Sequence, residues 1–184
     1  MSKTLQELKD EIISYGKIAG AKNYTPGVSG NISARYGENV LITASGTANG
    51  YLRDDDFAVV DFAGNSLQGI KKPSSETPLH LEFYRLREDI NYIIHVHSPY
   101  LSSFASCGMA LDEPIMAENV FYFGKIPLAE YGLPSYWDLV EKTSKYFREY
   151  NAVLMANHGF IVGGKSIEEA YLRLELAESY AHVV

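Results

Sequence analysis

Cysteine and cationic side chains are scarce in this sequence of 184 residues. The single cysteine, Cys107, excludes an intrachain disulfide and favours a reducing compartment. The 16 Lys and Arg residues are outnumbered by 23 Asp and Glu, and the net charge of −7 argues against a broad basic surface for nucleic acid or anionic membrane. A local anion site is still compatible with this charge, because backbone amides can hold a phosphate on an acidic protein.

Long apolar runs are absent from the sequence as well. No stretch is long enough to cross a bilayer, and residues 1–7 lack the apolar segment of a signal peptide. The length, together with a hydrophobic content of 46%, fits one domain with a full core. We therefore expect a cytoplasmic protein whose residues 1–184 form a single domain.

Predicted helices and strands are mixed along the chain, which favours an α/β layered sheet over a helical bundle or a β-sandwich. Two capping-box patterns, in residues 4–7 and 166–169, predict the starts of an N-terminal and a C-terminal helix. Residues 32–35 and 40–43 flank a turn and predict a β-hairpin.

The segment Ile93–Pro99 carries two histidines at strand spacing. Successive side chains of a strand point to opposite faces, so His95 and His97 share one face while Ile94 and Val96 point into the core. Paired imidazoles on a buried strand are costly unless a group such as a divalent metal uses them. Two ligands do not make a metal site, however, and a hydrogen-bonded histidine pair is the alternative.

A third histidine, His158, follows the predicted buried strand 152–155 and precedes Gly159. Its place at a strand end allows two interpretations, a third metal ligand or an ordinary turn residue. From the residues alone, both stay open.

Two loops, residues 25–31 and 44–50, are rich in Gly, Ser, Thr and Asn. Such loops can offer amides and hydroxyls to an anion, or they can be ordinary polar turns.

A predicted helix with Thr77 as its N-cap follows Ser74, Ser75 and Glu76. The dipole at a helix N-terminus favours negative charge. The serines therefore could hold a phosphate while Glu76 moves a proton, but Glu76 could equally just complement the dipole.

Taken together and in this order, these motifs resemble the class II aldolase/adducin family, and most closely its fuculose-phosphate aldolase branch. The motifs that carry the resemblance are Gly30-Asn31, Ser45-Gly46, Ser74-Ser75-Glu76, His95-x-His97 and Asn157-His158-Gly159. The resemblance implies a three-layer α/β/α domain around a mixed, largely antiparallel sheet. It also implies a homotetramer with active sites at the subunit interfaces.

The resemblance further assigns roles to individual residues. It implies that one Zn²⁺, or another divalent transition metal, is bound by His95, His97 and His158, and that Glu76 is the acid/base. The implied reaction is cleavage of a phosphorylated ketose to dihydroxyacetone phosphate and an aldehyde through a zinc-stabilised enediolate. The substrate phosphate would be held by Asn31, Ser45, Gly46, Ser74 and Ser75.

The chain departs from the family pattern in two places. The tyrosine that a neighbouring subunit supplies in the aldolase branch has no clear counterpart, and Glu118, Tyr122 and Tyr131 are the candidates. The sequence also ends at Val184, without the C-terminal tail that reaches the site in related enzymes.

Other activities of the family give alternative hypotheses. They are a dehydratase of the methylthioribulose-1-phosphate type, a sugar-phosphate epimerase, a decarboxylase and a non-catalytic adducin-like scaffold. Three further residues receive no function: we expect His80 on a helix surface, His182 in solvent and Cys107 as a small buried residue.

Overall fold

A sheet of eight strands organises residues 3–184, the part of the chain that the computed structural model describes. Its strand order is β4-β3-β2-β1-β5-β8-β7-β6. Only the β6–β7 pair is parallel, so the sheet is mixed and largely antiparallel, as predicted. The strands are β1 (Asn31–Tyr36), β2 (Asn39–Thr43), β3 (Phe57–Asp61), β4 (Ser66–Gln68), β5 (Tyr92–Val96), β6 (Leu128–Ala129), β7 (Ala152–Met155) and β8 (Gly159–Gly164).

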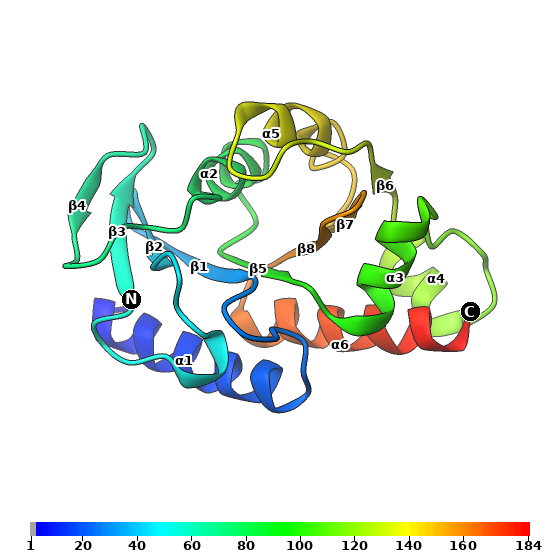
Figure 1. The fold of residues 1–184 in the computed structure, drawn as a ribbon, viewed down its shortest axis with the longest axis horizontal. Coiled ribbons are helices and arrows are strands. Elements are labelled where there is room, and N and C mark those ends of the chain that lie inside the picture. Colours follow the sequence, from blue (N-terminus) through cyan, green and yellow to red (C-terminus); the bar gives the residue numbers. More distant parts are fainter. Residues whose placement is uncertain (1–2) are drawn as a thin grey trace.

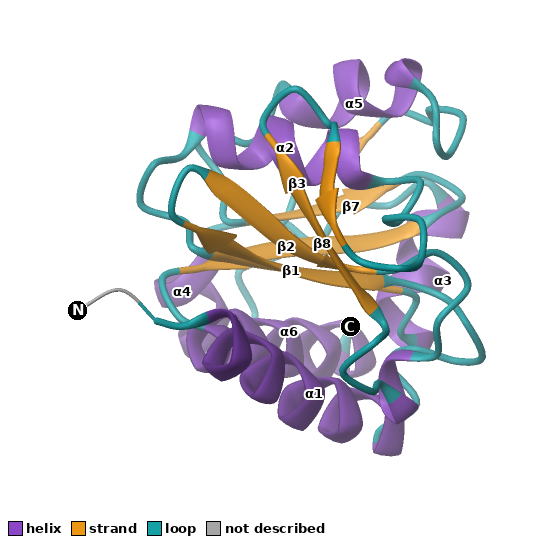
Figure 2. Ribbon diagram, turned by 90° about the vertical axis from the view of Figure 1, so that its left-hand side faces the viewer, coloured by secondary structure: helices purple, strands orange, loops and turns teal. Residues whose placement is uncertain are grey.

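Helices cover both faces of this sheet (Figures 1 and 2). One face packs against α1 (Leu5–Ala21), α3 (Pro99–Cys107), α4 (Ala117–Phe123) and α6 (Ile167–Val183). The opposite face packs against α2 (Thr77–Leu86) and α5 (Trp137–Ser144), and a short 3₁₀ helix, η1 (Asn49–Tyr51), lies beside α1. The predicted three-layer α/β/α architecture is therefore confirmed. Within residues 3–184, no helix has both the length and the apolar character needed to span a bilayer.

Strand β5 lies in the middle of the sheet and is buried along its whole length. Ile94 and Val96 join the core beneath α1 and α6, whereas Ile93 joins the core beneath α2 and α5. Because side chains alternate along a strand, His95 shares the face of Ile93 and is directed toward the α2 side. The alternation predicted for this segment is confirmed.

The capping boxes differ in how completely they form. At α1, the Thr4 side chain accepts from the Glu7 N–H and the Glu7 carboxylate accepts from the Thr4 N–H, so both halves of the box are present. At α6, the Ser166 hydroxyl accepts from the Glu169 N–H at 3.1 Å, but the Glu169 carboxylate accepts from the Lys165 N–H instead of closing the box. The second predicted box is thus only half formed.

The start of α2 also differs from the prediction. Glu76, not Thr77, occupies the N-cap position. The Thr77 hydroxyl donates to the Ser74 carbonyl at 2.6 Å, and Thr77 is already the first residue of the helix. This shift by one residue places the Glu76 side chain at the very start of the helix.

A close approach of β1 to β5 depends on Gly30. Its φ of +72° lies in the left-handed region, and a Cβ at this position would lie 2.4 Å from the His95 carbonyl oxygen. The buried Asn49 side chain donates to the carbonyls of Ser29 and Gly30 and holds the loop in place. As a result, Asn31 pairs directly with His95 across the two strands.

The core beneath α2 and α5 contains a stacked pair of aromatic rings, Phe83 and Phe147, with centroids 4.0 Å apart. Neither side chain is exposed to solvent. We expect Phe147→Ala to lower the free energy of unfolding by about 3–5 kcal/mol, because it removes the apolar contacts and leaves a cavity. Urea denaturation measures this loss.

A matched control is Tyr51→Ala, since the Tyr51 side chain is 85% exposed. Its effect should stay within about 0.5 kcal/mol. Equal losses in the two variants would contradict the described core.

Candidate functional site

Three histidines from two separate parts of the chain converge at the site. His95 and His97 lie on and directly after β5, and His158 lies in the turn between β7 and β8. One ring nitrogen of each lies within 4.8 Å of the others. The ring centroids are 4.8–5.1 Å apart and the rings meet edge to face. The structure therefore brings together the three residues that the sequence suggested as metal ligands.

The tautomer of His95 follows from its hydrogen bonds. Its Nδ1 lies 2.9 Å from the Phe160 carbonyl oxygen, which can only accept, so Nδ1 carries the proton. The Nε2 lone pair is then free to bind a cation. Burial lowers the pKa of His95 to about 3, and burial also lowers the pKa of His97. Both rings are therefore neutral near pH 7, the form that binds metal.

The turn that carries His158 needs an unusual backbone. Asn157 has a φ of 54°, in the left-handed region that asparagine tolerates better than most residues. At Gly159, a Cβ would lie 2.5 Å from the Val96 carbonyl oxygen. These two residues let the turn pack directly against the end of β5, so that His158 reaches the other histidines.

Glu76 faces this histidine cluster from the start of α2. Its Oε2 lies 3.2 Å from Nε2 of His95 and accepts from the Asn31 amide at 2.9 Å, while Oε1 lies 3.0 Å from Nε2 of His158. Burial alone would raise the pKa of Glu76, but the hydrogen bonds that the carboxylate accepts from His158 and the Asn31 amide lower it below its usual range. The carboxylate is therefore ionised although it is only 7% exposed.

The donor set fits a divalent transition metal. Among residues 3–184, no Lys or Arg forms an ion pair with Glu76, whose ionisable neighbours are His95 and His158. An ionised carboxylate beside neutral imidazoles is costly to bury unless a cation is near. Three imidazole nitrogens and an adjacent oxygen donor are typical of zinc and related ions. The residues present thus fit a metal bound by His95, His97 and His158.

A cavity of about 250 Å³ opens above Glu76 and the histidines. Its lining includes all five residues expected to hold phosphate, namely Asn31, Ser45, Gly46, Ser74 and Ser75. No Lys or Arg lines it, so any anion there would be held by hydroxyls, amides and the N-terminus of α2. Val28, Ser29, Gly30 and Ala44 in the lining come from the two loops that the sequence suggested for an anion, whereas Pro134 and Ser135 were not predicted.

The expected phosphate residues are not equivalent in this cavity. Ser45, Gly46 and Ser75 lie at its exposed rim, where their polar groups can meet a ligand. Ser74 is buried, and its backbone N–H donates to the Thr43 carbonyl at 3.2 Å. The Asn31 amide donates to Glu76, so Asn31 holds the carboxylate as well as lining the cavity.

The expectation for His80 is wrong. This side chain is 0% exposed, because it lies on the face of α2 that packs against the sheet. Its Nδ1 lies 2.7 Å from the Ser33 hydroxyl, which in turn lies 2.8 Å from the Tyr84 hydroxyl. Burial lowers the pKa of His80 to about 3. His80 thus belongs to a buried polar chain of side chains next to the site.

The predictions for Cys107 and His182 have opposite outcomes. Cys107 is exposed at the end of α3, so its predicted burial is wrong. His182 is exposed as predicted, and its ring stacks on Tyr100 with a centroid distance of 4.1 Å.

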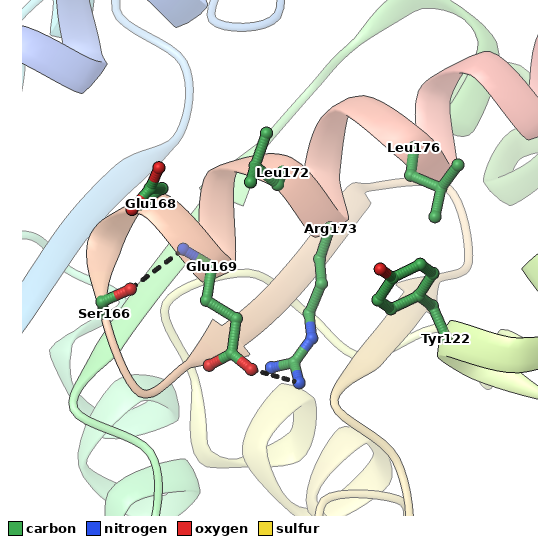
Figure 3. A pocket seen from close by; sticks show the side chains of 7 residues that line it. All are labelled: Tyr122, Ser166, Glu168, Glu169, Leu172, Arg173 and Leu176. Atoms are coloured by element: carbon green, nitrogen blue, oxygen red, sulfur yellow. Dashed lines mark hydrogen bonds and ion pairs between the residues drawn. The ribbon is translucent and has the colours of Figure 1, made fainter. Parts of the chain in front are cut away.

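The candidates for a proton donor on the aldehyde side do not line the cavity of their own chain. Glu118, Tyr122 and Tyr131 are all absent from its lining. Tyr122 instead lines a separate cavity of about 480 Å³, where its ring lies beside Arg173 and Leu176 of α6 (Figure 3).

Comparison with known proteins assigns the chain to a family. The family described as "Class II Aldolase and Adducin N-terminal domain" matches residues 10–184. The chain belongs to this family. The class II aldolases of this family are enzymes and are generally metal-dependent, which agrees with the histidine cluster.

Individual relatives carry different activities in their names. The L-fuculose phosphate aldolase of Methanocaldococcus jannaschii is 36% identical over 87% of this chain and 86% of its own length. The 3-oxo-tetronate 4-phosphate decarboxylase of Haemophilus influenzae is 34% identical over 94% of this chain and 84% of its own length.

The fold of nearly the whole chain is also similar to that of a solved structure. The solved structure of an L-fuculose 1-phosphate aldolase superimposes with a TM-score of 0.92 at 30% identity, and it covers 99% of this chain and 86% of the other. This class II aldolase family member therefore has the fold that the sequence motifs implied.

Zinc binding tests the histidine cluster. We expect one zinc ion per chain, and we expect His97→Ala to lower the zinc affinity more than about 100-fold because one of three ligands is lost. Competition with a chelating dye measures the affinity. The control is His182→Ala, an exposed histidine outside the cluster, which should bind zinc like the parent. Unchanged affinity in His97→Ala would exclude the cluster as the metal site.

The burial of His80 predicts a pH dependence of stability. The folded pKa of about 3 lies below the unfolded value of about 6.5, so the unfolded state takes up a proton as pH falls through 6.5. The free energy of unfolding should then fall by up to about 1.4 kcal/mol per pH unit between those values.

The non-titrating variant His80→Gln isolates this contribution. Both proteins are denatured at several pH values between 6 and 4, with zinc removed from each. The free energy of unfolding should depend less steeply on pH in the variant, by the equivalent of about one bound proton. Identical slopes would mean that His80 is not held neutral by the fold.

Proposed function

We propose that this protein is a zinc-dependent class II aldolase that cleaves a phosphorylated ketose to dihydroxyacetone phosphate and an aldehyde. The single observation that carries the proposal is the Glu76 carboxylate, which faces three imidazole nitrogens at the base of a cavity with hydroxyls at its rim. Another divalent transition metal could replace zinc in this donor set.

His95, His97 and His158 would hold the metal through neutral imidazoles. When bound, such an ion supplies Lewis acidity that favours negative charge on the carbonyl and hydroxyl oxygens of the substrate. The hydrogen bond from His95 to the Phe160 carbonyl fixes one of these rings in advance, so little reorganisation is needed at the site.

Glu76 is suited to proton transfer at carbon. In the direction of C–C bond formation, its ionised carboxylate takes a proton from the hydroxymethyl carbon of dihydroxyacetone phosphate. In cleavage, the same group returns that proton to the carbon left by the departing aldehyde. Asn31 and the short tether to α2 keep the carboxylate aimed into the cavity.

The phosphate would lie at the rim of the cavity. Ser45, Gly46 and Ser75 offer donors there, and Ser74 and Asn31 complete the lining. The start of α2 adds the positive end of a helix dipole. An anion group can therefore be recognised without a cationic side chain.

We further propose that this domain acts as a homotetramer in the cytoplasm, with active sites at subunit interfaces. Phe121 and Tyr122 of α4 are 82% and 54% exposed, which is unusual for adjacent aromatic residues on a monomer surface. Glu118, Tyr122 or Tyr131 of a neighbouring chain would then supply the proton donor for the aldehyde oxygen.

Decarboxylation of a phosphorylated keto acid is the second candidate function. The 34% identity to a 3-oxo-tetronate 4-phosphate decarboxylase favours it. Loss of CO₂ beside a carbonyl leaves the same kind of charge as aldol cleavage, and Glu76 could protonate the same carbon.

Turnover by the zinc-loaded chain tests the proposal. We expect release of dihydroxyacetone phosphate from a short ketose 1-phosphate, measured with a coupled dehydrogenase, and we expect EDTA to abolish it and Zn²⁺ to restore it. Release of CO₂ from 3-oxo-tetronate 4-phosphate, without activity on any ketose phosphate, would replace the aldolase with the decarboxylase.

Glu76→Gln tests the role of the carboxylate. We expect it to retain zinc but to lose turnover by about 10²–10⁴-fold, because the proton-transferring group is gone. Glu82→Gln is the matched control on the same helix, since Glu82 pairs with Arg85 outside the site. Full activity in Glu76→Gln would remove Glu76 from the mechanism.

A further inference from the structure

A loop that carries none of the sequence motifs reaches the anion cavity. Residues 130–136 connect β6 to α5, and Ser135 at the end of this loop lines the cavity together with Pro134. The Ser135 hydroxyl donates to the Ser75 hydroxyl over 2.8 Å. A side chain from a loop distant in sequence therefore contacts one of the expected phosphate residues directly.

The backbone of Ser135 is strained. Its φ of 70° lies in the left-handed region, which is unfavourable for a residue with a Cβ and is found at sites where the surroundings impose it. Neighbouring hydrogen bonds impose this conformation on Ser135. The Leu133 N–H donates to the Asp138 carboxylate at 3.0 Å, and the Tyr136 N–H donates to the Leu133 carbonyl at 3.2 Å. These two hydrogen bonds fix the backbone on either side of Ser135.

The rest of the loop is anchored as well. The Lys142 ammonium donates to the Tyr131 carbonyl at 2.6 Å. A Cβ on Gly132 would lie 2.4 Å from the Cα of Leu139, so the loop backbone packs directly on α5. The position of the Ser135 hydroxyl is therefore set by the fold and not by chance rotation of a free loop.

The hydrogen bond has a consequence for Ser75. A hydroxyl group has one proton and two lone pairs. Because the Ser75 oxygen accepts from Ser135, its own proton is directed elsewhere, and the cavity lies on its open side. Donation to Ser75 also polarises its O–H bond and makes it a stronger donor to an anion.

We propose that Ser135 is a positioning residue that orients the Ser75 hydroxyl toward the phosphate of the substrate. The inference rests on the proposed function, since it assumes that the ligand in this cavity carries a phosphate. It adds to that function a determinant of affinity for phosphorylated over unphosphorylated substrate. The strained backbone conformation of Ser135 is what brings its hydroxyl to Ser75.

The test compares binding of dihydroxyacetone phosphate and of dihydroxyacetone to the zinc-loaded protein by calorimetry. Ser135→Ala should weaken binding of the phosphate about three- to tenfold, the effect of one ordinary hydrogen bond, and leave dihydroxyacetone binding unchanged. Equal loss for both compounds, or no loss for either, would overturn the proposal.

Ser135→Gly separates the hydroxyl from the backbone. Glycine adopts the left-handed conformation readily, so this variant should melt at a higher temperature than Ser135→Ala. Its loss of phosphate affinity should nevertheless match that of the alanine variant. Restored affinity in Ser135→Gly would assign the effect to strain and overturn the role of the hydroxyl.

A double-mutant cycle shows whether Ser135 acts through Ser75. In a Ser75→Ala background, Ser135→Ala should have no further effect on the affinity for dihydroxyacetone phosphate. Additive losses would mean that the two serines act independently, against the proposal.

The outcomes also separate this inference from the proposed function. A phosphate preference that depends on Ser135, in a protein without aldol cleavage, leaves the inference intact and overturns the aldolase. Absence of any phosphate preference in the parent protein overturns the inference, whereas cleavage activity can still be measured.

Discussion

An ionised carboxylate buried among neutral imidazoles is the constraint on which this site depends. Glu76 is ionised because the hydrogen bonds that it accepts from His158 and the Asn31 amide oppose the effect of its burial. Burial disfavours the charged form of His95 and His97 and lowers the pKa values of both rings. The negative charge of Glu76 is therefore not compensated by a neighbouring side chain, and a cation bound by the imidazoles would neutralise it. The same negative charge on Glu76 would therefore favour metal binding and allow the carboxylate to accept a proton.

The sheet builds this cluster by placing three chain segments next to one strand. Strand β5 lies between β1 and β8, so Asn31 pairs with His95 on one side and the turn with His158 approaches on the other. Gly30 and Gly159 permit these approaches, because a side chain at either position would collide with a backbone oxygen of the segment 95–96. Helix α2 then presents Glu76 from above the sheet. The site is thus a product of strand order rather than of any one motif.

Much of this arrangement could be predicted from the sequence, where local rules apply. The shared face of His95 and His97 follows from strand alternation, and the position of Glu76 at a helix start follows from the Ser-Ser-Glu-Thr-Pro pattern. The approach of His158 depends on the pairing of β5 with β8, which no local pattern encodes, so only the family resemblance indicated it. The burial of His80 cannot be predicted in the same way, because helical periodicity alone does not show that a polar residue faces the sheet. No local pattern indicates the role of Ser135, because its contact with Ser75 depends on how residues 130–136 pack on α5.

Anomalous X-ray diffraction at the zinc edge, from crystals of the zinc-loaded protein, tests the central claim most directly. The account predicts one zinc ion per chain, about 2.1 Å from an imidazole nitrogen of His95, His97 and His158. It also predicts that the Glu76 carboxylate lies beside the ion and not in solvent. A zinc peak at another place, or a Glu76 side chain directed away from the histidines, would contradict the account.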